Sequence, residues 1–303
     1  MKVIIAGASV GGLLLAYKLG KTGNDVVVFD KKDYINLGYD WYDFVWPDFF
    51  DKLDMNDIRI DFFRKNNMSF EIHGYEETIR LNQKEGNREY AVNRRQLSKF
   101  LYEKASEFAK INLSATVDSP VTDGNSVKGI VAEGEEHCAD LVIDNLGVFS
   151  PLRRGLPSGT NIEREINAKN IMFAYRAFFK KEGSGVIKDD TKCYLRHLGE
   201  DGISWVNIEN GGAIDVLVGR IGALSLEGAE GAVSQLKKEN PYIGEKISGG
   251  GRIYAIPVSH PATKLFCEGY AMIGDSGQWP CPCSGAEFIL LLRRLIFYPM
   301  LWL

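Results

Sequence analysis

The sequence predicts an α/β fold, in which a discontinuous Rossmann-like nucleotide-binding domain carries an inserted antiparallel β-sheet domain. Three observations predict it. A strand–turn–helix–strand unit that ends on an acidic residue opens the chain, a short apolar strand lies at 139–144, and long strand-like segments follow one another over 171–221. Strands that alternate with helices indicate a parallel sheet, whereas a run of strands indicates an antiparallel one.

The first thirty residues have the layout of a dinucleotide-binding βαβ unit. A strand over 3–6 leads into a glycine turn, an apolar helix covers 13–19, and a strand over 26–29 ends at Asp30. In such a unit the glycines permit a tight turn and close packing, and the helix N-terminus offers N–H groups to phosphates. An acid at the end of the second strand can accept hydrogen bonds from ribose hydroxyls. The residues predicted to bind a dinucleotide are Gly7, Ala8, Ser9, Gly11, Gly12 and Asp30.

Position 9 departs from the fingerprint, which has glycine there. Gly7-Ala8-Ser9-Val10-Gly11 also spells G-x-S-x-G, the nucleophile elbow of serine hydrolases. That interpretation requires an acid and then a histidine, to be found among His73, His137, His197 and His260. An elbow does not need an acid at the end of the next strand, so Asp30 favours the dinucleotide site. A third interpretation is an α/β domain whose glycines serve packing alone.

The composition is that of a soluble globular protein. The chain has 303 residues, 45% of them hydrophobic and 25% charged, enough for one large domain or two intimate ones. A net charge of −4 gives no electrostatic case for nucleic-acid binding. Five cysteines without C-x-x-C spacing argue against a disulfide framework or a zinc site, so no metal site is predicted.

The ends of the sequence bear on localisation. A strand that begins at residue 3 leaves no room for a signal peptide, and with the cysteine usage this predicts a cytoplasmic protein. The apolar segment 289–303 contains two arginines and a proline and is shorter than the roughly 20 residues of a membrane span. It could form a surface-seeking anchor, a buried end or an aberrant terminus, and the first of these implies a peripheral membrane contact.

The periodicity between these segments predicts the remaining elements. An amphipathic helix over 95–109 places Leu97, Leu101 and Phe108 on one face. A second helix over 225–239 ends before Pro241. Strands are predicted at 68–73, 78–81, 90–92, 112–116, 127–132, 139–144, 171–179, 192–198, 203–208, 213–221, 250–257 and 271–273. The nucleotide-binding domain is assigned to 1–66, 93–160 and 263–303, and the antiparallel sheet domain to 67–92 and 161–262.

Five segments of the chain follow one another in a recognisable order. They are the N-terminal fingerprint with Asp30, Val92-Asn93-Arg94-Arg95-Gln96-Leu97, Ala115-Thr116-Val117, Asp144-Asn145-Leu146-Gly147-Val148-Phe149-Ser150-Pro151-Leu152-Arg153, and Gly274-Asp275 followed by Pro282 and Gly285. Together they resemble the flavoprotein family of geranylgeranyl reductases and aromatic hydroxylases, which belongs to the para-hydroxybenzoate-hydroxylase-like superfamily. The chain looks most similar to the geranylgeranyl-reductase-like branch. The resemblance implies that the dinucleotide is FAD.

The resemblance also implies roles for individual residues. Arg94 would lie near the flavin and the pyrophosphate, and Val117 would belong to the strand that gives backbone contacts to adenine. Gly147 falls in the segment that resembles the family's Asp-Gly motif. Gly274, Asp275, Pro282 and Gly285 would surround the ribityl chain and the flavin. Cys281 and Cys283 would lie nearby, although two cysteines in a proline-rich loop are more often incidental.

Two departures from the family pattern bear on function. Leu146 stands where hydroxylases carry an aspartate linked to pyridine-nucleotide binding, which weakens the hydroxylase interpretation. The resemblance stops near residue 286, where the family continues with glycine and a helix of small residues, and this chain has Glu287. We therefore expect a truncated or frame-shifted end, with part of the flavin site missing.

The function implied is an FAD-dependent oxidoreductase that reduces carbon–carbon double bonds of an isoprenoid or lipid. Trp205 falls where the reductases have an aromatic motif and is a candidate for the substrate cavity or, nearly as well, for the core. No second glycine fingerprint precedes a helix, which indicates an external electron donor: a reduced pyridine nucleotide, ferredoxin or another carrier. The alternatives are a flavin-dependent monooxygenase or halogenase of the same superfold, and a flavin-binding protein without turnover.

Overall fold

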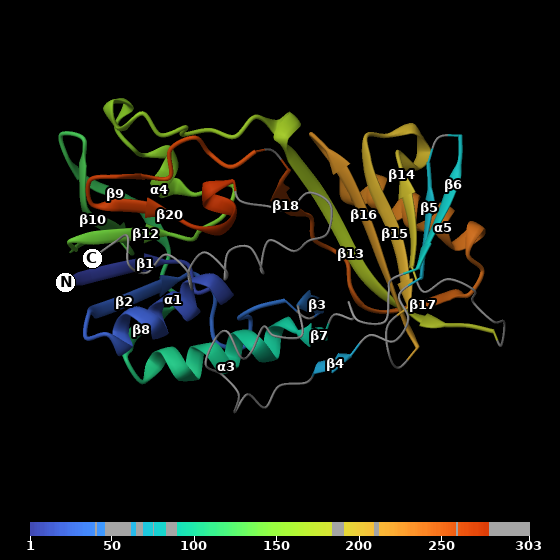
Figure 1. The fold of residues 1–303 in the computed structure, drawn as a ribbon, viewed down its shortest axis with the longest axis horizontal. Coiled ribbons are helices and arrows are strands. Elements are labelled where there is room, and N and C mark those ends of the chain that lie inside the picture. The colour runs from blue at the N-terminus through green and yellow to red at the C-terminus, as the bar shows by residue number, and fades with distance from the viewer. Residues whose placement is uncertain are drawn as a thin grey trace. The chain divides into compact units, whose positions relative to one another are not determined.

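The structure, a computed structural model, describes residues 1–39, 41–45, 62–64, 69–74, 76–82, 90–183, 191–208, 212–258 and 260–278 (Figure 1). The chain forms two compact units. Unit 1 comprises Met1–Phe62, Ala91–Ile166 and Pro257–Leu303, and unit 2 comprises Phe63–Tyr90 and Asn167–Ile256. The divisions predicted from sequence, after residues 66, 92, 160 and 262, differ from these by a few residues each, and the role of each unit stays a prediction.

Unit 1 is built on a six-stranded sheet of order β19–β20–β12–β1–β2–β8. Neighbouring strands are parallel, except that β19 runs antiparallel to β20. Because β1 lies between β2 and β12, the segments that follow β1 and β12 meet at one edge of the sheet. The strands are β1 (Lys2–Ala6), β2 (Asp25–Asp30), β8 (Ala109–Leu113), β12 (Leu141–Asp144), β19 (Phe266–Cys267) and β20 (Tyr270–Met272).

Helices and a second sheet accompany this sheet. The helices α1 (Val10–Lys21) and α3 (Arg94–Ser106) pack against each other, α1 against β2 and α3 against β8 (Figure 1). A three-stranded antiparallel sheet contains β9 (Val117–Asp123), β10 (Ser126–Ala132) and β11 (Glu135–Cys138). Shorter elements are α4 (Pro151–Arg154), η2 (Ser158–Thr160) and η5 (Gly274–Gly277). A further short sheet has the order β3 (Tyr42–Val45), β7 (Tyr90–Asn93) and β4 (Phe62–Arg64).

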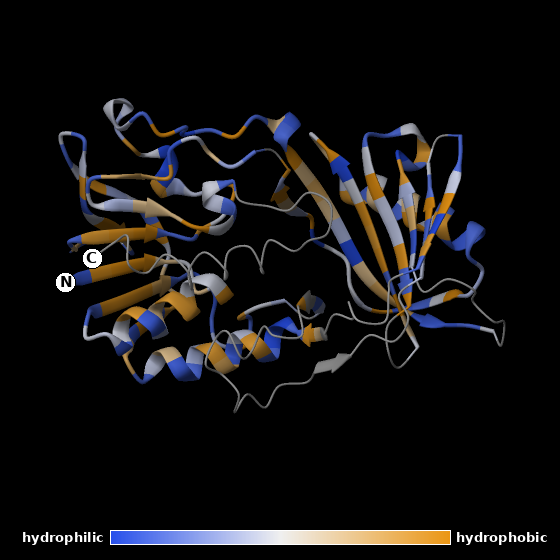
Figure 2. Cartoon of the chain, viewed as in Figure 1, coloured by the Kyte–Doolittle hydropathy of each residue, from blue (hydrophilic) through white to orange (hydrophobic). Residues whose placement is uncertain are grey.

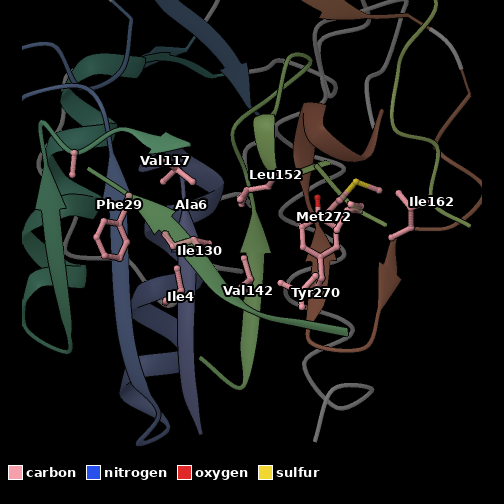
Figure 3. Close-up of a cluster of buried hydrophobic side chains, with 14 of the residues drawn as sticks. Ile4, Ala6, Phe29, Val117, Ile130, Val142, Leu152, Ile162, Tyr270 and Met272 are labelled. Carbon is pink, nitrogen blue, oxygen red and sulfur yellow. The ribbon is translucent and has the colours of Figure 1, made fainter. Parts of the chain in front are cut away.

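The core of unit 1 lies between the parallel sheet and the β9–β10–β11 sheet. Figure 3 shows Ile4, Ala6 and Val142 from the parallel sheet beside Val117 and Ile130 from the second sheet. All of these side chains are buried. Since side chains alternate along a strand, Val3 and Ile5 point to the opposite face, and they are buried as well. Burial on both faces explains why β1, β2 and β12 read as apolar runs (Figure 2).

Unit 2 is an eight-stranded sheet of order β17–β13–β16–β15–β14–β5–β6, with β18 also paired to β13. The pair β14–β5 is parallel, whereas the pairs β17–β13, β13–β16, β16–β15, β15–β14 and β5–β6 are antiparallel. The helix α5 (Leu226–Glu239) packs its buried Ala229, Ala232 and Leu236 onto one face. The strands are β5 (Ser69–His73), β6 (Thr78–Asn82), β13 (Ile171–Lys181), β14 (Thr191–Leu195), β15 (Gly202–Ile208), β16 (Ala213–Ile221), β17 (Ile243–Gly249) and β18 (Tyr254–Pro257), with η3 (Ala168–Asn170) and η4 (His197–Gly199).

Several predicted boundaries were wrong, and positive φ angles account for most of them. The predicted strand 112–116 lies instead at Ala109–Leu113, because Ser114 adopts φ 56°. The helix before it consequently ends at Ser106. The strand predicted to run through 198 ends at Leu195, because Arg196 and Leu198 have φ 51° and 62°. The strand predicted over 250–257 is shortened to Tyr254–Pro257 by Gly250 and Gly251. The strands β9, β11 and β17 were not predicted.

No helix in the described ranges has the length and hydrophobicity needed to cross a bilayer. The apolar segment 289–303, Glu287, Cys281, Cys283, Pro282 and Gly285 all lie outside the described residues.

Candidate functional site

The glycine turn joins the end of β1 to the start of α1, as predicted. Gly7 has φ 108° and donates from its N–H to the carbonyl of Phe29 at 2.7 Å. A Cβ on Gly7 would lie 2.4 Å from the carbonyl oxygen of Asn145, and a Cβ on Gly12 would lie 2.1 Å from that of Gly7. Both positions therefore require glycine because backbone segments meet there.

Ser9 is the N-cap residue of α1, but its side chain does not cap the helix. The hydroxyl oxygen instead accepts a hydrogen bond of 2.6 Å from Asn145 Nδ2, which also donates to the carbonyl of Gly7 at 3.0 Å. The first N–H groups of a helix have no acceptor within the helix. With the hydroxyl held by Asn145, those of α1 remain available to an anion. Asn145 was not among the predicted site residues, although its place directly after a predicted central strand was a usable signal.

The same geometry bears on the serine-hydrolase interpretation. A serine nucleophile needs a general base within hydrogen-bond reach of its hydroxyl. The group that contacts Ser9 Oγ is the amide of Asn145, an N–H donor that cannot take up the serine proton. The structure therefore gives this interpretation no support.

Asp30 ends β2 with its carboxylate turned to the glycine turn. Its Oδ2 accepts from the N–H of Ala8 and its Oδ1 from the N–H of Lys32, each at 2.7 Å. A carboxylate has about four lone-pair positions. Each oxygen can therefore accept a further hydrogen bond, so the residue suits a ribose while it also fixes the turn.

Val117, the residue predicted to contact adenine, is buried at the start of β9. It pairs with Ala132. The preceding residue, Thr116, uses its backbone groups in contacts with Glu133: its N–H donates to Oε1 at 2.6 Å, and its carbonyl accepts from the Glu133 N–H at 3.1 Å. Adenine contacts of Val117 stay a prediction.

The predicted motifs 144–153 and 274–275 are joined by one buried network. Asp144 is fully buried and accepts from the hydroxyl of Tyr270 at 2.6 Å, from Ser276 at 2.9 Å and from Ser150. Gly147, with φ 87°, donates from its N–H to Ser276 Oγ at 2.7 Å. Two segments far apart in the sequence are thus held at the edge of the sheet where the strands end.

Arg153 closes this network. It is fully buried and donates to the carbonyls of Ser276 at 2.7 Å, Arg164 at 3.3 Å and Val148. Burial lowers the pKa of its guanidinium, and the charge of Asp144 opposes that shift. The side chain is engaged with backbone on several sides, so its role is to hold the two motif segments together.

Arg94 and Asp275, both predicted to lie near the flavin, influence each other electrostatically. Arg94 is the first residue of α3. Its Nη1 lies 2.9 Å from Asp43 Oδ2, and its Cζ lies over the ring of Tyr39, 4.8 Å from the ring centroid. Burial raises the pKa of Asp275 to about 6, and the positive charge of Arg94 acts in the opposite direction. Unit 1 therefore brings together the glycine turn, Asp30 and Gly147 at strand ends, and places Arg94 within electrostatic reach of Asp275.

Trp205 belongs to unit 2, where it lies half-buried in β15. Its Nε1–H donates to Asp215 Oδ2 at 3.3 Å, and Asp215 also receives two hydrogen bonds from Arg176, at 2.9 and 2.8 Å. The side chain is thus oriented by a buried ion pair. Within the described residues, no group of three or more His, Cys, Asp or Glu could hold a metal ion.

This architecture can be compared with that of known proteins. No family model matches the chain. Among curated proteins, it is 28% identical over 172 residues to the FAD-dependent monooxygenase ctvC of Aspergillus terreus, which covers 54% of this chain and 36% of that protein. The chain therefore matches only about a third of that relative's length.

Solved structures resemble almost the whole chain. The geranylgeranyl bacteriochlorophyll reductase-like protein Ta0516 of Thermoplasma acidophilum matches with a TM-score of 0.79 and 17% identity, over 98% of this chain and 76% of that one. The probable FAD-dependent monooxygenase PqsL of Pseudomonas aeruginosa matches with 0.68 and 16%, over 97% and 84%. The myxobacterial chondrochloren halogenase CndH matches with 0.69 and 14%, over 97% and 72%.

The chain has the fold of these flavoproteins. The predicted Rossmann-type domain with an inserted antiparallel sheet domain is confirmed. Because the matching structures include a reductase-like protein, a monooxygenase and a halogenase, the likeness does not separate the predicted reductase branch from the others.

Proposed function

We propose that the chain binds FAD through unit 1 and belongs to an FAD-dependent oxidoreductase. The observation that carries the proposal is the glycine turn, in which Asn145 holds the Ser9 hydroxyl away from the helix N–H groups and Asp30 stands at the adjoining strand end. The free N–H groups of α1 bind the pyrophosphate, and Asp30 accepts from the adenosine ribose. Arg94 supplies positive charge, and Asp275 offers a carboxylate to the ribityl hydroxyls. FAD, when bound, supplies the redox chemistry.

The substrate is proposed to meet the face of the unit 2 sheet that α5 does not cover. Val216 and Val218 pack in the cluster under α5, so Leu217 between them points to the other face. Leu217 and Cys193 pair with Trp205 on either side. This row is largely apolar and has the buried Arg176–Asp215 ion pair beside it, a composition that suits an apolar small molecule or lipid.

The finer proposal is reduction of carbon–carbon double bonds in an isoprenoid or lipid, with electrons from an external donor: a reduced pyridine nucleotide, ferredoxin or another carrier. Leu146 supports it, since the aspartate typical of hydroxylases is absent there. A monooxygenase or halogenase is the second candidate, favoured by the similarity to ctvC. The third is a flavin-binding protein without turnover, which Ser9 and Leu146 both favour. We propose a cytoplasmic location with peripheral membrane contact.

The first test is FAD binding by the purified protein, measured as flavin absorbance that remains with the protein after gel filtration. Gly12→Ala should abolish it, because the new Cβ would lie 2.1 Å from the Gly7 carbonyl. Gly231→Ala is the matched control, since its Cβ would meet nothing within 4 Å. A wild-type protein that retains no flavin after incubation with excess FAD would overturn the proposal.

A flavin-loaded protein then separates the three candidate activities. Saturation of a polyunsaturated isoprenoid under anaerobic conditions with a chemical reductant indicates a reductase. Substrate-dependent oxygen consumption with a hydroxylated or halogenated product indicates the second candidate. Stable flavin bands without either reaction indicate a binding protein.

A further inference from the structure

A buried arginine in unit 2 has no carboxylate partner among the residues that the structure describes. Arg220, near the end of β16, is 6% exposed. Its hydrogen bonds come from Nη1, to Ser204 Oγ at 3.3 Å and to the Gly219 carbonyl at 2.8 Å. No carboxylate of the described chain lies within ion-pair distance, and Glu200 acts on it only through its more distant charge. Arg176 in the same sheet, by contrast, has Asp215. A buried cation without a counter-charge is costly, so this one needs an explanation.

A histidine beside it also has an unused polar atom. His197 in η4 is 6% exposed, and its Nε2 is buried without a hydrogen-bond partner. Its Nδ1 lies 3.1 Å from Ser204 Oγ, the same oxygen that Arg220 contacts. Arginine is only a donor, so Ser204 accepts from Arg220. The proton of the fully buried Ser204 then goes to His197 Nδ1, which leaves the imidazole proton on Nε2.

The guanidinium and the imidazole therefore form a positively charged set of donors, in which His197 Nε2–H has no acceptor among the described residues. Burial lowers the pKa of His197, so its imidazole is neutral at pH 7 and the guanidinium carries the charge. The ring of Tyr194 lies 5.4 Å from that of His197 and forms an aromatic neighbour. Ser204 shares its sheet face with Val206 in the cluster under α5, so this set lies on the face opposite Trp205.

We propose that Arg220 and His197 bind a small oxyanion, a carboxylate or a phosphate group. One oxygen accepts from the guanidinium, whose planar fork suits such groups, and another accepts from His197 Nε2–H. The oxyanion would neutralise the buried charge and satisfy the unpaired imidazole N–H. This site uses neither the glycine turn nor Trp205, so it stands apart from the proposed flavin chemistry.

Thermal unfolding of the full chain tests the proposal. Inorganic phosphate and acetate are titrated separately, against chloride at matched ionic strength. We expect a saturable rise in Tm with one of the two probes, and the probe that acts identifies a phosphate or a carboxylate site. Arg220→Gln should abolish the rise, whereas Arg252→Gln, which changes an exposed arginine of the same unit, should keep it. Phosphate that bound at the glycine turn would stabilise both variants equally.

A second variant covers the case in which Arg220→Gln does not fold. His197→Phe keeps an aromatic ring and removes the Nε2–H donor. Calorimetric titration with the active probe should show binding weakened about tenfold, the loss expected for one hydrogen bond to a charged group. The proposal is overturned if neither probe acts beyond chloride, or if the probe acts equally on the wild type and the variants.

Discussion

The side-chain amide of Asn145 donates to Ser9 Oγ across 2.6 Å and thereby fixes the rotamer of the residue at the head of α1. A serine at an N-cap normally accepts from the N–H of the second or third helical residue. Here the hydroxyl is diverted to the end of β12, and the same amide bonds the Gly7 carbonyl. Asn145 thus compensates for the absence of glycine at position 9.

Asn145→Ala should therefore weaken FAD binding. Without the amide, the Ser9 hydroxyl can turn to the helix N–H groups and compete with the pyrophosphate. We expect a loss of about tenfold in affinity, the equivalent of one hydrogen bond to a charged group, measured by quenching of flavin fluorescence. In the double variant Ser9→Gly/Asn145→Ala most of the affinity should return. Equal losses in the single and double variants would show that Asn145 acts through something other than Ser9.

Asp30→Ala should lower both stability and FAD affinity. The N–H groups of Ala8 and Lys32 lose their acceptor, which is expected to cost about 1–3 kcal/mol of unfolding free energy. Urea denaturation measures the stability and flavin fluorescence the affinity. Asp25→Ala, at the exposed start of the same strand, is the control and should change neither.

Asp144→Ala should be among the most destabilising substitutions in unit 1. The hydroxyls of Tyr270 and Ser276 lose a buried acceptor, and Arg153 loses the nearby charge that opposes its desolvation. The expected loss is at least about 3 kcal/mol, because the buried hydroxyls of Tyr270, Ser276 and Ser150 each lose an acceptor, at about 1–3 kcal/mol apiece. Tyr270→Phe removes one of these hydrogen bonds and should cost only about 1 kcal/mol. Similar losses for the two variants in chemical denaturation would contradict a network centred on Asp144.

Elements of the fold could be predicted from the sequence where a single local interaction determines the backbone conformation. The βαβ unit was predictable because Gly7, Gly12 and Asp30 are each required by backbone geometry within thirty residues. The strand boundaries near Ser114 and Arg196 were not, because left-handed φ angles at non-glycine residues leave no pattern in composition. The strand β17 is largely exposed along its middle and lacks the apolar alternation that reveals a half-buried strand.

The candidate site was predictable in its parts and not in its connections. Asp144, Gly147 and Gly274-Asp275 could be picked out as motifs, but Ser276 and Arg153, which join them, looked like ordinary neighbours in the sequence. Contacts such as Ser276 to Asp144 span 132 positions, and their pairing is decided by the order of the strands. Trp205 could be assigned to a strand, but its bond to Asp215 depends on the register between β15 and β16.

Trp205→Phe should distinguish the contribution of the indole N–H to stability from that of the aromatic ring. The variant loses the hydrogen bond to Asp215 and keeps most of the ring, so we expect a loss of about 1 kcal/mol in unfolding free energy. Asp215→Ala leaves the buried guanidinium of Arg176 without its partner and should cost about 3–5 kcal/mol. Urea denaturation distinguishes the two. If Trp205→Phe is as unstable as Asp215→Ala, the main role of Trp205 is to stabilise the core and not to contact a substrate.

Asp275 should make the stability of the flavin-free protein fall as pH rises from about 4 to about 6. Burial raises its pKa to about 6, above the value of about 3.9 expected in the unfolded chain. Between these two values the folded protein binds more protons than the unfolded one, so raising the pH favours unfolding. Asp275→Asn should remove this slope when urea denaturation is repeated across the range. Glu268→Gln is a control with the opposite expected sign. A hydrogen bond from Ser126 and the charge of Lys128 lower the pKa of Glu268, so the stability that this carboxylate contributes is lost as pH falls. An Asp275→Asn protein with the wild-type slope would show that the carboxyl is already ionised at pH 4.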